Sequence, residues 1–146
     1  MDFLTALNIS SSGLSAQRIR MNVISANLAN IETTRTPEGG HYRRKDVVFA
    51  ATPAGDPFGN MLESRMEDKV RQVEVLEIYS DNGPPRLKYD PSHPDANDKG
   101  YVAMPNITVI GEMINMLSAT RSYEANVTAI NATKNMALKA LEIGNV

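Results

Sequence analysis

Residues 4–31 read LTALNISSSGLSAQRIRMNVISANLANI, and their apolar side chains recur at the spacing of one helix face. These apolar positions are Leu4, Leu7, Leu14, Met21, Ile24, Leu28 and Ile31. The four residues Leu7, Leu14, Met21 and Leu28 follow one another at steps of seven. Ile24 lies three residues after Met21, and Ile31 lies three residues after Leu28, which is the pattern of a coiled-coil seam. The sequence therefore predicts a helix of about 28 residues, roughly 42 Å long.

Residues 10–13, SSSG, are poor helix formers within this pattern. Gly alone costs a helix about 1 kcal/mol relative to Ala. We therefore expect a kink at these residues, or a first stretch of helix that forms late, and a stronger seam in the second half.

A second long helix is predicted for residues 107–143. Pro105 and Asn106 are typical of the start of a helix, and Gly144 follows its end. Its seam runs through Ile110, Met113, Leu117 and Thr120, shifts by one residue, and continues through Tyr123, Val127, Ile130, Ala137 and Leu141. At about 37 residues this helix is roughly 55 Å long, about three times the mean of globular proteins. Two such helices form a rod rather than a sphere.

Charge is distributed unevenly along the chain. Residues 1–40 and residues 106–146 hold six charged side chains each, whereas the 65 residues between them hold the other 20 of the 32. A solvated helix normally presents a charged outer face, and these two helices have almost none. We expect protein to surround them on most sides, and a chain of 146 residues cannot do this alone. The pattern indicates a subunit of an assembly rather than an enzyme.

Small and amide side chains flank both seams, where a solvated coiled coil carries Glu and Lys. They include Asn22, Ser25, Ala26, Asn27, Ala29 and Asn30 near the first seam, and Asn115, Ser118, Ala119, Asn126 and Asn131 near the second. Small residues let helices approach closely, and amides bind one another without the desolvation cost of a charge. One interpretation is an interface between subunits, and the other is a solvated face that uses amides.

Composition limits the function classes further. The length suits one domain, and a net charge of −2 gives no electrostatic reason to expect nucleic acid or an anionic membrane as a partner. No apolar run approaches the roughly 18–20 residues that span a bilayer, so no membrane insertion is expected. The N-terminus lacks the basic and apolar regions of a secretory signal, so the chain either stays in the cytoplasm or leaves without a cleaved signal. With no Cys, disulfides and thiolate chemistry are excluded.

The middle of the chain has the composition of short strands and turns. Residues 41–49 and 69–79 carry β-branched side chains in near-alternation, and residues 86–89 and 101–104 could add two more strands. Clusters of Pro, Gly, Asp and Asn separate them.

We predict a mainly α fold, in which long N- and C-terminal helices pack as an antiparallel coiled-coil-like pair with a small β-rich or extended middle insertion. Residues 1–35 and 106–146 supply the helices, and residues 36–105 form the middle segment.

Candidate metal sites are weak. Asp90, His93, Asp95 and Asp98 lie within nine residues, but a polar loop whose Asp and Pro residues set turns explains them better. Residues 95–100, DANDKG, begin like a calcium-binding loop. The fifth and twelfth positions of that loop are Lys and Asn, so we reject the assignment. No metal and no cofactor are expected.

Catalytic and nucleic-acid signals are equally weak. Only His41 and His93 could act as imidazole bases, and no Ser near them has the context of a nucleophile. The basic triplet of residues 43–45 could bind phosphate or RNA, but an outward strand face or a contact with another subunit is the better interpretation. No glycine-rich phosphate loop is present. The sequence predicts no enzyme activity.

Four motifs resemble those of bacterial flagellar basal-body rod proteins. Residues 11–18, SSGLSAQR, followed by residues 25–30, SANLAN, resemble the N-terminal signature of the rod and hook proteins. Residues 112–116 and 122–127 resemble their C-terminal signature. Residues 84–96 and 100–106 narrow the resemblance to the proximal rod group. The usual Thr-Pro-Gly-Tyr turn is replaced by residues 36–42, and residues 55–68 carry none of the motifs on which the resemblance rests, so no role is assigned to them.

The resemblance implies a structural subunit of the proximal rod. In that family the terminal helices line the inner layer of a hollow helical tube, a drive shaft that crosses the periplasm, transmits torque and encloses the export channel. The subunits are exported by the flagellar type III apparatus without a cleaved signal. The implied partners are further copies of the chain, other rod proteins, the basal-body ring or adaptor at the rod base, and the export apparatus.

Two sets of residues are predicted to make contacts between subunits. The assembly interface consists of Leu7, Leu14, Met21, Ile24, Asn27, Leu28, Asn30, Ile31, Met113, Leu117, Tyr123, Asn126, Val127, Ile130 and Leu141. Further contact candidates in the middle are Tyr42, Arg43, Arg44, Arg86, Tyr89 and His93.

Because the helices have little charge, we expect them to be disordered in the monomer and to fold on joining the growing tip. A cytoplasmic helical adaptor is the alternative, and it would form a small, finite, well-folded oligomer. An enzyme or binding module would keep a stable fold by itself and carry a pocket within residues 41–105.

Overall fold

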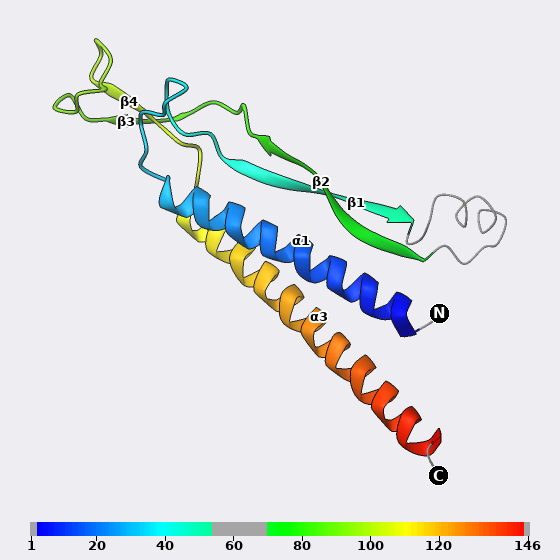
Figure 1. The fold of residues 1–146 in the computed structure, drawn as a ribbon. Coiled ribbons are helices and arrows are strands. Elements are labelled where there is room, and N and C mark those ends of the chain that lie inside the picture. The colour runs from blue at the N-terminus through cyan, green and yellow to red at the C-terminus, as the bar shows by residue number, and fades with distance from the viewer. Residues whose placement is uncertain (1–2, 54–69, 145–146) are drawn as a thin grey trace.

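Two long antiparallel helices form the body of the computed structural model, which describes residues 3–53 and 70–144 (Figure 1). Helix α1 spans Phe3–Ala29 and helix α3 spans Val109–Gly144, close to the ranges predicted from the apolar spacing. Two short hairpins lie between them in the sequence. The predicted fold, a mainly α structure with paired terminal helices and a small β-rich insertion, is confirmed. Residues 55–68, to which the sequence assigned no role, lie outside the described residues.

Helix α1 runs unbroken through residues 10–13, so the expected kink is absent, while the alternative of a first stretch that forms late stays a prediction. The Ser12 hydroxyl donates to the carbonyl of Ile9 at 2.7 Å and accepts the Val73 N–H at 3.1 Å. Gly13 is buried against α3. Although both are poor helix formers, Ser12 binds the backbone of Val73 and Gly13 permits close packing against α3.

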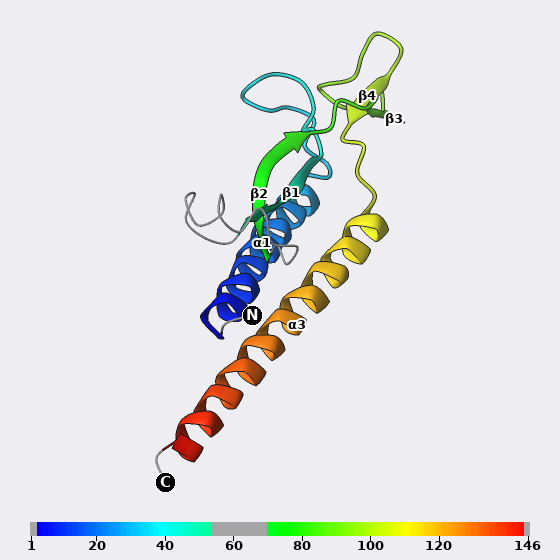
Figure 2. The same ribbon diagram turned by 90° about the vertical axis from the view of Figure 1, so that its right-hand side faces the viewer.

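The first hairpin pairs β1 (Lys45–Pro53) with β2 (Arg71–Ser80) in antiparallel register, with a bulge between Val48 and Phe49. Strand β1 begins four residues later than the strand predicted over residues 41–49. The preceding residues form a loop instead, because the Tyr42 N–H donates back to the Thr33 carbonyl at 3.0 Å. Both strands pack against α1, so this helix contacts the hairpin as well as α3 (Figure 2).

The second hairpin pairs β3 (Arg86–Tyr89) with β4 (Tyr101–Met104), as predicted. Tyr89 and Tyr101 face each other edge to face with their ring centroids 5.2 Å apart. Strand β4 leads directly into α3 through Pro105 and Ile107, both buried.

The apolar core is small. Its buried members are Ala16, Val23, Ile24, Val102, Met104, Ile107 and Ala119. They lie on α1, on β4 and the segment that follows it, and on α3, so no single layer encloses them. Neither helix in the described part of the chain combines the length and the apolar character needed to cross a membrane. Much apolar surface consequently remains exposed, and it is the main feature of the candidate site.

Candidate assembly interface

The first half of α3 carries a broad apolar face that no described residue covers. Val109, Ile110, Met113, Ile114 and Leu117 are between 49% and 74% exposed. At 3.6 residues per turn these five fall on one side of the helix. Glu112 and Ala119, 3% and 0% exposed, lie on the opposite side, and α3 packs on α1 there. A face of this kind marks an interaction site.

The second half of α3 extends past the start of α1. The antiparallel pairing brings Glu112 to Asn27 and Asn126 to Gly13, so the last turns of α3 have no counterpart on α1 (Figure 1). Met136, Leu138, Leu141 and Ile143 in these turns are between 49% and 77% exposed. Helical geometry places them on different sides of the helix. Apolar side chains on more than one side of a helix are normally covered in a larger body, so this overhang is suited to insertion between other helices, with its exposed Lys139–Glu142 ion pair on the remaining side.

A buried polar cluster joins α1, β1 and α3 at the other end of the molecule. The Asn27 amide, fully buried, donates to the Lys45 carbonyl at 2.8 Å and to Oε2 of Glu112 at 3.1 Å. Its Oδ1 accepts the Lys45 N–H at 2.9 Å and the Tyr42 hydroxyl at 3.2 Å. Asn27 therefore makes all four hydrogen bonds that its amide allows. Its side chain thus binds both backbone groups of Lys45, as the backbone of a neighbouring strand would, at the start of β1.

Arg44 completes this cluster. Its Nε donates to Oε1 of Glu112 at 2.8 Å, and its Nη1 donates to Asp46 at 2.9 Å. Burial opposes the charge of Asp46, but the hydrogen bonds from Arg44 and the Val47 N–H, together with the nearby arginine charges, lower its pKa below the ordinary value. Burial, and secondarily the Glu112 charge, raises the pKa of Tyr42. The cluster therefore favours a negative Asp46 and a neutral Tyr42.

Comparison with known proteins identifies the family. The family model described as flagella basal body rod protein matches residues 7–35, and that described as flagellar basal body rod FlgEFG protein C-terminal matches residues 98–143. The flagellar basal-body rod protein FlgC of Bacillus subtilis is 49% identical over 95% of this chain and 96% of its own length. The FlgC proteins of Borreliella burgdorferi and Escherichia coli O157:H7 are 44% and 41% identical, with at least 98% of both chains covered. The chain belongs to the FlgC family of flagellar basal-body rod proteins.

Membership of the FlgC family confirms the resemblance and the predicted function as a structural rod subunit. The two matched segments contain nearly all of α1 and α3. The exposed face and the overhang of α3 therefore lie within the parts of the chain that are characteristic of rod proteins.

The predicted interface residues divide into three groups in this FlgC-family structure. Met113, Leu117 and Leu141 are exposed. Ile24 and Asn27 are 4% and 0% exposed, so contacts inside the protomer already occupy them. The remaining members are half-buried: Leu7, Leu14, Met21, Leu28, Asn30, Ile31, Tyr123, Asn126, Val127 and Ile130. Direct contact with a neighbour remains a prediction for the exposed and half-buried groups.

The contact candidates of the middle also separate by their surroundings. Tyr42 and Arg44 belong to the buried cluster, whereas Arg86 and Tyr89 are exposed on β3. Arg43 is exposed and donates to Asn82 at 2.6 Å.

His93 lies in the loop between β3 and β4, where its Nδ1 accepts the Asp95 N–H at 3.1 Å.

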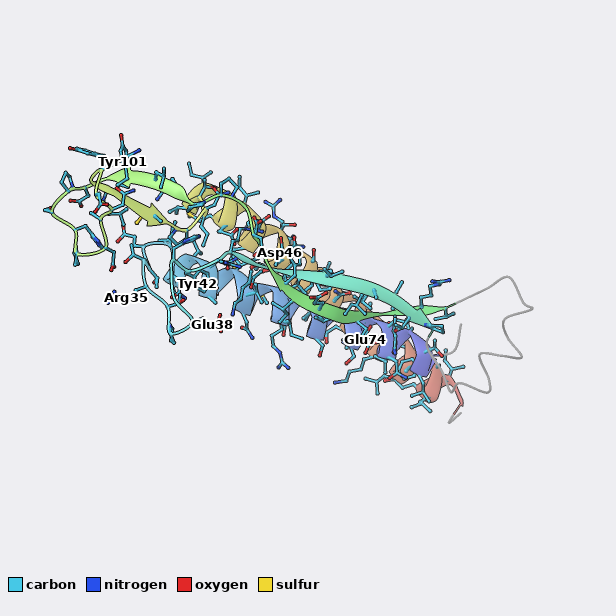
Figure 3. All side chains as sticks on the ribbon, turned by 90° about the horizontal axis from the view of Figure 1, so that it is seen from above. Arg35, Glu38, Tyr42, Asp46, Glu74 and Tyr101 are labelled. Carbon is cyan, nitrogen blue, oxygen red and sulfur yellow. The ribbon has the colours of Figure 1, made fainter. Side chains whose placement is uncertain are left out.

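A cleft of about 470 Å³ lies beside the loop of residues 33–43 and is lined by Arg35, Arg43 and Lys45 among others. Figure 3 shows Arg35, Glu38 and Tyr42 together at this end of the molecule.

Sequence reasoning missed the role of Glu112. It is the only charged residue between Lys99 and Arg121, in a helix whose neighbouring positions are apolar or small. An isolated carboxylate in such a stretch indicates a buried partner, and this signal was available. The seam pattern also omitted Val109, Ile114, Met136 and Ile143, which are exposed in the protomer. Among the described residues, no group of His, Asp and Glu side chains is placed to bind a metal.

Proposed function

We propose that this chain polymerises through α1 and α3 into the wall of a hollow helical tube, the proximal part of the flagellar rod. In this proposal the tube crosses the periplasm as a drive shaft, transmits torque and encloses the export channel. The middle segment projects outward and touches neighbouring subunits. The chain has no catalytic role.

The exposed apolar surface of α3 is the observation that carries this proposal. In the first half of the helix, one side packs on α1 and the opposite side is a row of large apolar side chains. In the overhang, apolar side chains point in several directions. Water is a poor environment for both surfaces, and neighbouring helices of the same kind would cover them.

The overhang further suggests how the subunits are arranged. It projects beyond one end of the helix pair, whereas the apolar face Val109–Leu117 lies near the other end (Figure 1). When one patch meets a different patch on the next copy, the contact is heterologous and generates an open helical array rather than a closed pair. The expected partners are further copies of this chain, other rod proteins, and the ring or adaptor at the rod base.

Delivery and assembly would follow from the same surfaces. We propose that the chain passes through the flagellar type III export apparatus without a cleaved signal and as an unfolded thread. The terminal helices would become fully ordered when neighbours enclose them, because an isolated helix gains most of its stability from packing. Stiffness of the shaft would come from dense packing between helices.

The experiment replaces an exposed apolar residue of α3 in a flagellated bacterium that lacks its own FlgC. Leu117→Glu and Ile114→Glu place a charge on a side chain that is more than half exposed in the protomer. The expected result is export of both variants at the normal level, at least a tenfold loss of the chain from purified basal bodies, and loss of swimming.

Leu117→Met is the matched control, since it keeps an apolar side chain of similar volume and should assemble normally. Thermal unfolding of the purified variants should match that of the parent chain. Normal rods with both charged variants would contradict the proposal.

A further inference from the structure

Apart from the close fit of Asn126 against Gly13, the contact between α1 and α3 contains little that fixes how far one helix slides along the other. Ala119 is buried, and the Met21–Thr120 pair lies at this contact; small or flexible groups of this kind fit several registers. A shift by one turn moves one helix by about 5.4 Å along the other. Such a shift would replace many of these contacts by similar ones.

The buried carboxylate of Glu112 is different, because it is satisfied in a single register. Its Oε1 accepts from Arg44 at 2.8 Å and its Oε2 from Asn27 at 3.1 Å. After a slip of one turn towards the start of α1, Glu112 would lie opposite Val23, which offers no hydrogen-bond donor on its side chain, and a slip the other way would carry it past Ala29, the end of α1. A buried charge without a partner is strongly unfavourable. Glu112 therefore penalises slipped registers, in addition to the fit of Asn126 against Gly13.

The same cluster also fixes the position of the first hairpin. Asn27 binds the backbone N–H and carbonyl of Lys45, the first residue of β1, and Arg44 precedes it. The hydrogen bonds of Asn27 and Glu112 can therefore all form only when α1, α3 and the start of β1 are in their observed arrangement. This coupling lies entirely inside the protomer.

We propose that Asn27, Arg44 and Glu112 form a register lock that sets how far the α3 overhang projects beyond α1. The consequence for assembly rests on the function proposed above: in a helical array every copy must present its overhang at the same height. Copies that differ by one turn could not occupy equivalent positions. Arg44 and Glu112 are thus positioning residues that act through the overhang.

Replacing the ion pair by apolar residues tests the lock without leaving Arg44 or Glu112 as an unpaired buried charge. Exchange of a buried ion pair for well-packed apolar side chains is often neutral or stabilising. The double variant Arg44→Met with Glu112→Leu should nevertheless unfold at a somewhat lower temperature, because it leaves the buried Asn27 amide without its Glu112 acceptor and Asp46 without Arg44. If the lock exists, this variant loses the penalty on slipped registers and retains the fold.

Disulfide cross-linking reads the register, and the natural chain contains no Cys that would interfere. Met21→Cys with Thr120→Cys reports the observed register, in which the Thr120 hydroxyl donates to the Met21 sulfur at 3.7 Å. Met21→Cys with Met116→Cys, or with Glu124→Cys, reports a slip of one turn in either direction. The full-length chain is oxidised in an osmolyte that favours the folded state, and intrachain products are counted after separation by electrophoresis.

In the parent chain, the 21–120 product should exceed each slipped product at least tenfold. In the Arg44→Met, Glu112→Leu background, the slipped products should rise to within about threefold of it. The matched control is Lys139→Met with Glu142→Leu, which removes an exposed ion pair of the same helix and should leave the ratio unchanged. A ratio that stays above tenfold in the apolar variant overturns the register lock.

Incorporation of the apolar variant into basal bodies tests the link to assembly separately. A mixed register with at least a tenfold loss of incorporation supports the whole inference. A mixed register with normal rods overturns the role of the overhang while leaving the lock in place. The cross-linking ratio does not depend on rods, so failure of the lock and failure of the proposed function give different results.

Discussion

Gly13 of α1 faces Asn126 of α3 so closely that a Cβ at Gly13 would lie 2.9 Å from the Asn126 Nδ2. The Asn126 amide is itself held, because its Nδ2 donates to the Ser122 carbonyl at 3.1 Å. Only glycine leaves room for this arrangement. The residue that weakens α1 locally is therefore required where the two helices meet, and a substitution there has two opposing effects.

Gly13→Ala should lower the free energy of unfolding by about 1–3 kcal/mol, because the new methyl group overpacks the contact with Asn126. In an Asn126→Ala background the same substitution should instead raise it by about 1 kcal/mol, since the better helix propensity of Ala then acts alone. Urea unfolding of the four proteins in this cycle measures the difference. An equal effect of Gly13→Ala in both backgrounds would rule out the clash.

Leu28→Asp and Val127→Asp each place a charge on a half-buried position of the predicted seam. Both variants should be exported normally and fail to enter the rod, because a charge enclosed between helices has no partner. The amount of chain in purified basal bodies, compared with the amount exported, provides the measurement. Leu28→Met and Val127→Ile are the conservative controls. Rods of normal length with either Asp variant would refute the seam assignment.

Acid should destabilise the protein through Asp46. Its pKa is lower in the folded chain than the unfolded value of 3.8, so its contribution to stability is complete above that value. This contribution is lost as the pH falls through the folded pKa, when the proton removes the charge that Arg44 and the Val47 N–H bind. In Asp46→Asn the free energy of unfolding should fall less steeply below about pH 4. Urea titrations between pH 2 and pH 6 test this, and identical slopes in both proteins would contradict it.

The helicity of the purified chain should depend on its concentration. The two helices of the structure comprise 27 and 36 residues. In a dilute sample we expect a circular dichroism signal at 222 nm below the value for that content, because neighbours are needed to cover α3. The signal should rise with concentration or with added rod proteins, in step with faster sedimentation. A dilute, fully helical protomer with no tendency to associate would exclude coupled folding and assembly.

Much of the fold could be predicted from local pattern. The ranges of α1 and α3 followed from apolar spacing, and β3 and β4 followed from short β-branched and aromatic stretches between turns. The first strand was predicted to begin at residue 41, whereas β1 begins at Lys45. The reason is that the Tyr42 N–H donates to the carbonyl of Thr33, which lies before the predicted strand. The first part of the second seam was predicted to run through Ile110, Met113 and Leu117, yet these side chains are exposed on the side of α3 away from α1.

The amino-acid sequence by itself determined two long helices of low charge, a β-rich middle and the family of the protein, because each of these depends on residues near one another along the chain. The tertiary structure alone decided which helix side is enclosed and which is left open. It also decided that Asn27, Arg44 and Glu112 meet, although 85 residues separate the first from the last. Contacts between distant segments depend on how the chain closes on itself, and periodicity carries no information about that closure.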